Sequence, residues 1–214
     1  MTNAPDVRIL RAADRTAEAW KNGGGVTRQI AAGACGSGTG SGTGPGSGTA
    51  PGSASGDFGW RVSLAEVAAD GPFSVFPGVD RTLTLAEGAG MDLTVDGVPR
   101  LVDERYAPQR FPGDAATGCR LLAGPVVNFN VMYRRDTTRA EVAVVRGDLA
   151  LTAPPGGGAL LVVSLAGPVS VEGAHTDRVG LGTYDALLAT GGEQGVLHLG
   201  AEGRAAVVRF TPAG

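Results

Sequence analysis

Residues 58–81, FGWRVSLAEVAADGPFSVFPGVDR, decide the fold class that the sequence predicts. Residues 60–65 alternate between large apolar side chains and polar or small ones, and a period of two is typical of a strand. Two turn signals follow, at Asp70-Gly71-Pro72 and at Pro77-Gly78, where glycine permits a positive φ and proline fixes φ. The stretch therefore predicts a strand, two tight turns and the start of a second strand, as in an all-β protein.

The two faces of the first of these strands differ in chemistry. Trp60, Val62 and Leu64 share one face, whereas Arg61 and Ser63 lie on the other. An arginine and a serine on one face could bind a small anion. The same pattern also fits the solvated face of an antiparallel sheet. The strand pattern alone leaves both interpretations open.

Composition excludes several classes of protein. The net charge of −3 over 214 residues argues against a nucleic-acid-binding protein, which would show a basic stripe. No apolar run approaches the roughly 18 residues of a membrane-spanning helix. Residues 1–10 lack the basic and apolar segments of a signal peptide. With just two cysteines, Cys35 and Cys119, we expect a reduced, cytoplasmic protein without a membrane partner.

The rest of the chain predicts further strands and turns and no helix. Three glycines, 23–25, follow Trp20-Lys21-Asn22 and precede the alternating residues 26–30, which predicts a tight turn or a close backbone approach. A phosphate-binding loop is excluded because the lysine precedes the glycines and a strand follows them. Asp96-Gly97 predicts a hairpin, residues 110–114 a further turn, and residues 127–133 a strictly alternating strand.

Residues 33–56, GACGSGTGSGTGPGSGTAPGSASG, form a low-complexity segment. Such a composition buries too little apolar surface to offset the entropy of ordering. Because strands are predicted on both sides, we interpret the segment as a flexible insertion that expands a hairpin loop. It is not interpreted as a linker between domains.

The sequence also contains a weak internal repeat. Residues 82–97 resemble residues 161–173, and the strands predicted at 120–131 have counterparts at 197–209, about 77 residues further on. Two copies of a meander of short strands predict a duplicated small β-barrel or jelly roll.

Five motifs occur in a fixed order: WKNGGGVTRQI at 20–30, WRVSLAEV at 60–67, DGPFSVFPGVDR at 70–81, FPGD at 111–114 and NFNVMYRR at 128–135. This set resembles the HutD/Ves family over residues 7–210, apart from the insertion. The resemblance implies a bicupin, two cupin-like (RmlC-like jelly roll) barrels in one chain. The first barrel would cover about 58–135 plus the N-terminal strands, and the second about 140–210. It also implies a link to bacterial histidine utilisation, where members are thought to bind a small acidic metabolite and have no established enzymatic activity.

Metal-dependent and nucleophilic chemistry have little support in the residues. Cupin metal sites use two or three histidines and a glutamate, but this chain has only His175 and His198, both in its second half. Neither histidine belongs to a motif that would place it beside a serine or beside Cys119. We therefore expect no metal and no cofactor, and we expect structural roles for Asp80 and Asp114.

A recognition site is the remaining interpretation. Asn128, Asn130 and Met132 share one strand face, and buried amides without partners cost about 1–3 kcal/mol each. A polar ligand would supply those partners, and an arginine suits a carboxylate because its planar fork can bind both oxygens. The predicted ligand-binding residues are Trp20, Asn22, Arg61, Ser63, Asn128, Asn130 and Met132.

Three functions fit these residues. The first is a non-enzymatic protein that senses or buffers an acidic intermediate of histidine breakdown, such as a formylated glutamate or urocanate, as the family resemblance implies. The second is a metal-independent isomerase or hydrolase that acts on a small carboxylate and uses a carboxylate or Tyr106 as acid and base. The third is a scaffold whose barrels mediate a homodimer. The lack of histidines favours the first.

Overall fold

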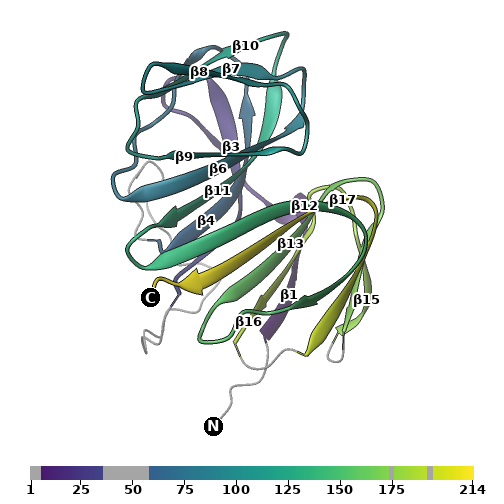
Figure 1. Ribbon diagram of the computed structural model, residues 1–214. Coiled ribbons are helices and arrows are strands. Elements are labelled where there is room, and N and C mark those ends of the chain that lie inside the picture. The colour runs from purple at the N-terminus through teal and green to yellow at the C-terminus, as the bar shows by residue number, and fades with distance from the viewer. Residues whose placement is uncertain (1–5, 36–57, 174–175, 192–194) are drawn as a thin grey trace.

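The computed structural model describes residues 6–35, 58–173, 176–191 and 195–214, and in these residues the fold is all-β (Figure 1). Their helical content is a single 3₁₀ turn, Ala12–Asp14. No helix among them is long and apolar enough to cross a membrane. The strands are β1 (Asp6–Leu10), β2 (Ala17–Ala19), β3 (Gly25–Gly33), β4 (Trp60–Val67), β5 (Gly71–Pro72), β6 (Val79–Glu87), β7 (Met91–Val95), β8 (Val98–Val102), β9 (Pro108–Pro112), β10 (Thr117–Leu121), β11 (Val126–Arg134), β12 (Thr138–Thr152), β13 (Ala159–Ala166), β14 (Val169–Gly173), β15 (Thr176–Leu181), β16 (Ala186–Thr190) and β17 (Val196–Pro212).

The strands form three antiparallel sheets. In the N-terminal half, a six-stranded sheet has the order β2-β3-β4-β11-β6-β9 and a four-stranded sheet has the order β5-β10-β7-β8. A seven-stranded sheet, β1-β16-β13-β17-β14-β15 with β12 also paired to β17, makes up the C-terminal half. Figure 1 shows the two smaller sheets above the larger one, with β12 and β13 facing the six-stranded sheet.

The N-terminal segment connects the two halves. β1 pairs with β16 in the C-terminal sheet, whereas β2 and β3 join the six-stranded sheet. The sequence predicts that all the N-terminal strands belong to the first barrel, and the pairing of β1 with β16 differs from that expectation. The Asp185 carboxylate fixes the crossing, because it accepts a hydrogen bond from the Ala12 amide at 2.7 Å and forms an ion pair with Arg11 at 2.7 Å.

Two predicted hairpins form, and two predicted turns differ. Gly71 and Pro72, predicted as part of a turn, form the short strand β5, which pairs with β10. Gly33 pairs with Trp60, so β3 and β4 form the predicted hairpin around the insertion, although residues 36–57 lie outside the described residues. Asp96 and Gly97 both have positive φ, 46° and 77°, in the tight turn between β7 and β8. The turn predicted at 110–114 is wrong for its first three residues. They extend β9, where Phe111 is buried opposite Arg81 on β6.

The internal repeat corresponds to a repeated strand pairing. Leu83 on β6 pairs with Asn130 on β11, and Leu161 on β13 pairs with Val208 on β17. Both members of the second pair lie 78 residues after those of the first (161 − 83 and 208 − 130). A displacement of 78 therefore relates equivalent positions in these central strands of the two halves.

A shared apolar core joins the halves. Trp60 on β4 stacks on Phe210 on β17, with ring centroids 4.3 Å apart and planes 12° apart. Val62, Leu64 and other residues of this β4 face pack in the same cluster as side chains of β13 and β17. One face of β4 is therefore committed to the contact between halves, which leaves the opposite face for a site.

Candidate functional site

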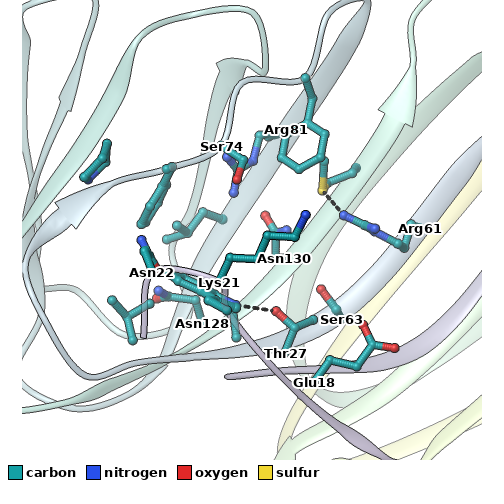
Figure 2. A pocket seen from close by; sticks show the side chains of 18 of the residues that line it. Glu18, Lys21, Asn22, Thr27, Arg61, Ser63, Ser74, Arg81, Asn128 and Asn130 are labelled. Carbon is teal, nitrogen blue, oxygen red and sulfur yellow. Dashed lines mark hydrogen bonds between the residues drawn. The ribbon is translucent and has the colours of Figure 1, made fainter. Parts of the chain in front are cut away.

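A cavity of about 460 Å³ lies on the opposite face of the six-stranded sheet, in the N-terminal half (Figure 2). Its size is in the usual range for small-molecule sites. All seven residues predicted from the sequence line it, together with twelve others. The complete lining is Glu18, Ala19, Trp20, Lys21, Asn22, Thr27, Arg61, Ser63, Ala65, Val67, Pro72, Phe73, Ser74, Phe76, Arg81, Leu83, Asn128, Asn130 and Met132.

Three neighbouring strands form the floor through their register. On β11, Asn130 lies opposite Ser63 of β4 on one side and Leu83 of β6 on the other. Met132 lies opposite Arg61 and Arg81 in the same way. Directly paired residues in an antiparallel sheet point to the same face, so the alternation of each strand sends these side chains into one cavity.

The Arg61 guanidinium has no carboxylate partner among the described residues. Its Nη2 donates a weak hydrogen bond to the Met132 sulfur at 3.3 Å, and its Nε is buried without a partner. Its guanidinium carbon lies 5.0 Å from the ring centroid of Phe58 and 5.7 Å from that of Phe76. Burial lowers the pKa of Arg61, and the charge of Glu18 partly opposes this effect. Arg61 is thus a largely buried cation that lacks an anion.

Arg81, which is not among the residues predicted from the sequence, is a second such cation. Its side chain is 8% exposed and makes no hydrogen bond or ion pair with any described residue. Its guanidinium carbon lies 5.2, 5.7 and 5.1 Å from the ring centroids of Phe73, Phe76 and Phe111. Burial and the nearby charge of Arg61 lower the pKa of Arg81 to about 10. The alternation of β6 alone did not indicate which face this arginine would take.

Two asparagines on the cavity floor are also unsatisfied. Asn128 is 1% exposed, and both its Oδ1 and its Nδ2 are buried without a partner in the described structure. Asn130 is 7% exposed, and its Oδ1 is also buried without a hydrogen-bond partner among the described residues. Each unpaired group costs about 1–3 kcal/mol. A molecule that both donates and accepts hydrogen bonds would remove these costs.

The turn between β2 and β3 forms the rim of the cavity. The Trp20 indole donates to the Thr27 hydroxyl at 2.8 Å and meets Phe73 edge to face, with centroids 6.3 Å apart. Gly25 is required here, because a Cβ at this position would lie 2.3 Å from the Glu66 carbonyl oxygen and 3.2 Å from the indole. Asn22 uses its amide oxygen to accept a hydrogen bond from the Gly24 amide at 3.1 Å. The close contacts of Gly25 confirm the close backbone approach predicted from the three glycines.

Comparison with known families identifies the chain. The HutD family model matches residues 12–208. The chain belongs to the HutD family. A Pseudomonas putida protein named as an uncharacterized 21.2 kDa protein in the hutC 3′ region is 32% identical over 204 residues, 95% of this chain and 97% of that protein. Protein Ves of Cronobacter sakazakii is 36% identical over 126 residues, 58% of this chain and 59% of Ves.

Solved structures agree with this assignment. HutD from Pseudomonas fluorescens SBW25, solved in a formate condition, has a TM-score of 0.75 and 31% identity, and the match covers 98% of this chain and all of that one. Ylba from E. coli has a TM-score of 0.66 at 8% identity, covering 100% and 93% of the two chains. Salicylate 1,2-dioxygenase from Pseudoaminobacter salicylatoxidans has a TM-score of 0.51 at 10% identity, covering 71% and 69%. The last two likenesses concern the fold alone, which is cupin-like.

The other described residues that the sequence suggests for chemistry lie outside the cavity of this HutD-family chain. Asp80 and Asp114 both form ion pairs with Arg135, and Asp114 also accepts a hydrogen bond from the Gly78 amide at 2.6 Å, so their roles here are structural. Tyr106 packs near Arg204. His198 is exposed on β17, Cys119 is buried on β10, and His175 is not among the described residues. Within the described ranges, no three His, Cys, Asp or Glu side chains are grouped as metal ligands.

The C-terminal half of the HutD-family chain has apolar side chains where the N-terminal half has the cavity floor. The displacement of 78 carries Arg81 to Ala159, Asn128 to Ala206, Asn130 to Val208 and Met132 to Phe210. All four of these later residues are at most 3% exposed and belong to the core that joins the halves. The face of the second half that corresponds to the cavity floor therefore packs against β4.

Proposed function

We propose that this HutD-family protein binds a small carboxylic acid in the cavity and senses or buffers it without catalysing its conversion. The observation that carries the proposal is Arg61, a largely buried guanidinium that lines the cavity without a carboxylate partner. A buried charge is costly unless it is paired. A carboxylate ligand would pair it through two parallel hydrogen bonds.

The surrounding residues suit an acid that carries further polar atoms. Asn128 offers a buried donor and a buried acceptor, and Asn130 offers a buried acceptor. The rings of Trp20 and Phe73 supply an apolar wall. We propose a cytoplasmic protein whose ligand is an acidic intermediate of histidine breakdown, such as a formylated glutamate or urocanate. The family resemblance implies such a ligand, and the hutC-region name of the P. putida relative supports it.

A thermal-shift experiment tests this proposal. At a free ligand concentration of about 100 times Kd, binding adds about 2.7 kcal/mol to the free energy of unfolding. For a chain of 214 residues this raises Tm by roughly 5–11 °C. Arg61→Ala should abolish the rise and remain folded. Arg28→Ala is the matched control, since Arg28 lies on the neighbouring strand β3 outside the cavity lining.

Two results would contradict the proposal. One is a normal shift in Arg61→Ala. The other is the absence of any shift with histidine-pathway acids at millimolar concentration.

A metal-independent isomerase or hydrolase has less support. Tyr106, the tyrosine considered as its acid or base, is not among the residues that line the cavity. Glu18 is the one carboxylate in the lining, and it lies exposed at the rim. Turnover of a histidine-pathway acid by pure protein in the presence of a chelator would favour this second function.

We also propose that the three sheets form two cupin-like barrels. The first would consist of the six- and four-stranded sheets, and the second of the seven-stranded sheet. The repeated pairing of β6 with β11 and of β13 with β17 supports this division. In this arrangement the first barrel carries the ligand, and the corresponding sheet face of the second packs against β4 of the first.

A further inference from the structure

We propose that Arg81 is a second anion-binding group, so that the cavity takes a dianion with one charged group on Arg61 and the other on Arg81. This inference rests on the proposed function, because it specifies the class of ligand for the same cavity.

The charge of Arg81 is not neutralised within the described structure. Its side chain is 8% exposed, and its Nε is buried without a hydrogen-bond partner. The adjacent residue Asp80 could have supplied a carboxylate, but that carboxylate pairs with Arg135 at 2.9 Å instead. Phenylalanine rings around the guanidinium attract it through cation–π contacts, but they carry no negative charge.

Arg61 does not neutralise the charge of Arg81, because it is a second cation that faces the same cavity. Both side chains line the cavity, and the charge of Arg61 contributes to the lowered pKa of Arg81. Arg61 forms no ion pair with a described residue either. The other charged side chains in the lining, Lys21 and Glu18, are opposite in sign, so the lining carries two net positive charges, which a single negative charge would only half compensate.

The separation of the Arg61 and Arg81 guanidinium groups also fits a single ligand. The guanidinium carbons of Arg61 and Arg81 each lie 5.7 Å from the ring centroid of Phe76, so they are no farther apart than twice that distance. The two ends of a short-chain dicarboxylate can reach two guanidinium groups at such a separation. Asn130 also lines the cavity, and its unpaired Oδ1 can accept a hydrogen bond from a ligand that carries an N–H group on the chain between its two carboxylates, as N-formylglutamate does.

Calorimetric titration with matched pairs of acids tests the inference. Each pair differs by a single replacement of a carboxylate by an amide: succinate and succinamate, glutarate and glutaramate, N-formylglutamate and N-formylglutamine. Wild-type protein should bind at least one dianion about tenfold or more tightly than its monoamide. In Arg81→Gln the two members of that pair should bind equally, whereas Arg81→Lys should keep part of the preference. Arg28→Gln, which removes a charge outside the cavity, should keep all of it.

The outcomes separate the two proposals. If every monoamide binds as tightly as its dianion to wild-type protein, and Arg61→Ala abolishes both, the inference about Arg81 is wrong and the proposed function stands. If no acid in the panel and no urocanate binds, both are wrong. Should Arg81→Gln fail to fold, Arg81→Lys decides the matter: a preference for the dianion as strong as in wild-type protein would mean that Arg81 does not bind the second charge.

Discussion

A buried arginine without a counter-ion lowers the stability of the free protein. Burial, more than the charge of Arg61, lowers the pKa of Arg81 from its ordinary value to about 10. A lowered pKa of a base means that the unfolded chain binds the proton more tightly than the folded chain does. The resulting penalty is present in full below a pH of about 10. It is relieved as pH rises toward the unfolded value, so the Arg81 contribution to stability increases with pH across that window.

Arg81→Met should therefore stabilise the ligand-free protein while it removes the preference for dianions. The pKa difference corresponds to a penalty on the order of 3 kcal/mol, and loss of the ring contacts offsets part of it. We expect Tm to rise by a few degrees in a buffer without polyvalent anions, measured by scanning calorimetry at neutral pH. A fall in Tm would mean that the phenylalanine rings alone satisfy the guanidinium.

At the scale of single residues, the sequence located the site better than it explained each contact. The alternation of β4 and β11 placed Arg61, Ser63 and Asn130 on shared faces, because strand periodicity is a local property. It could not reveal Arg81, since the face that β6 turns to the cavity depends on its register with β11. Nor could it show that the amide oxygen of Asn22 is used within its own turn.

At the scale of elements, the hairpin of β3 and β4 is closed independently of the insertion. Gly33 pairs with Trp60, and the Gly59 amide donates to the Gly33 carbonyl oxygen at 2.9 Å. Strand pairing up to this point fixes the ends of the loop. The length of the segment between them then has only a weak effect on stability.

Replacing residues 36–55 with a short Gly-Ser turn should leave folding and ligand binding intact. Loop closure costs about 0.6 kcal/mol for each doubling of loop length, so a shorter loop should be neutral or slightly stabilising. Thermal unfolding of the shortened protein, with and without ligand, checks this. A decrease in Tm of more than about 5 °C would show that the segment packs on the sheets, since that shift corresponds to more than about 1 kcal/mol.

At the scale of the whole molecule, the two halves share one core. Trp60 and Phe210 are 2% and 0% exposed and stack on each other across the boundary between halves. The sequence predicted the duplication from turn glycines and apolar runs. It did not predict that the second half turns its equivalent face onto the first, because that packing depends on contacts between segments more than a hundred residues apart.

Phe210→Ala should destabilise the whole chain. Removing a buried phenylalanine costs about 3–5 kcal/mol, which at about 2–4 °C per kcal/mol lowers Tm by roughly 6–20 °C. Because the core is shared, unfolding in urea should remain a single transition for wild type and variant, followed by both circular dichroism and tryptophan fluorescence. Two separate transitions, or a cost below about 1 kcal/mol, would mean that the halves are stable without each other.

The claim that Arg61 binds the carboxylate of the ligand in the cavity can be tested by isothermal titration calorimetry. The wild-type protein and Arg61→Ala would each be titrated with N-formylglutamate and with urocanate. One acid molecule should bind per chain, and this binding should be abolished in Arg61→Ala and retained in Arg28→Ala. Binding of equal affinity and stoichiometry in wild type and Arg61→Ala would contradict it, because the ligand would then lie outside the cavity.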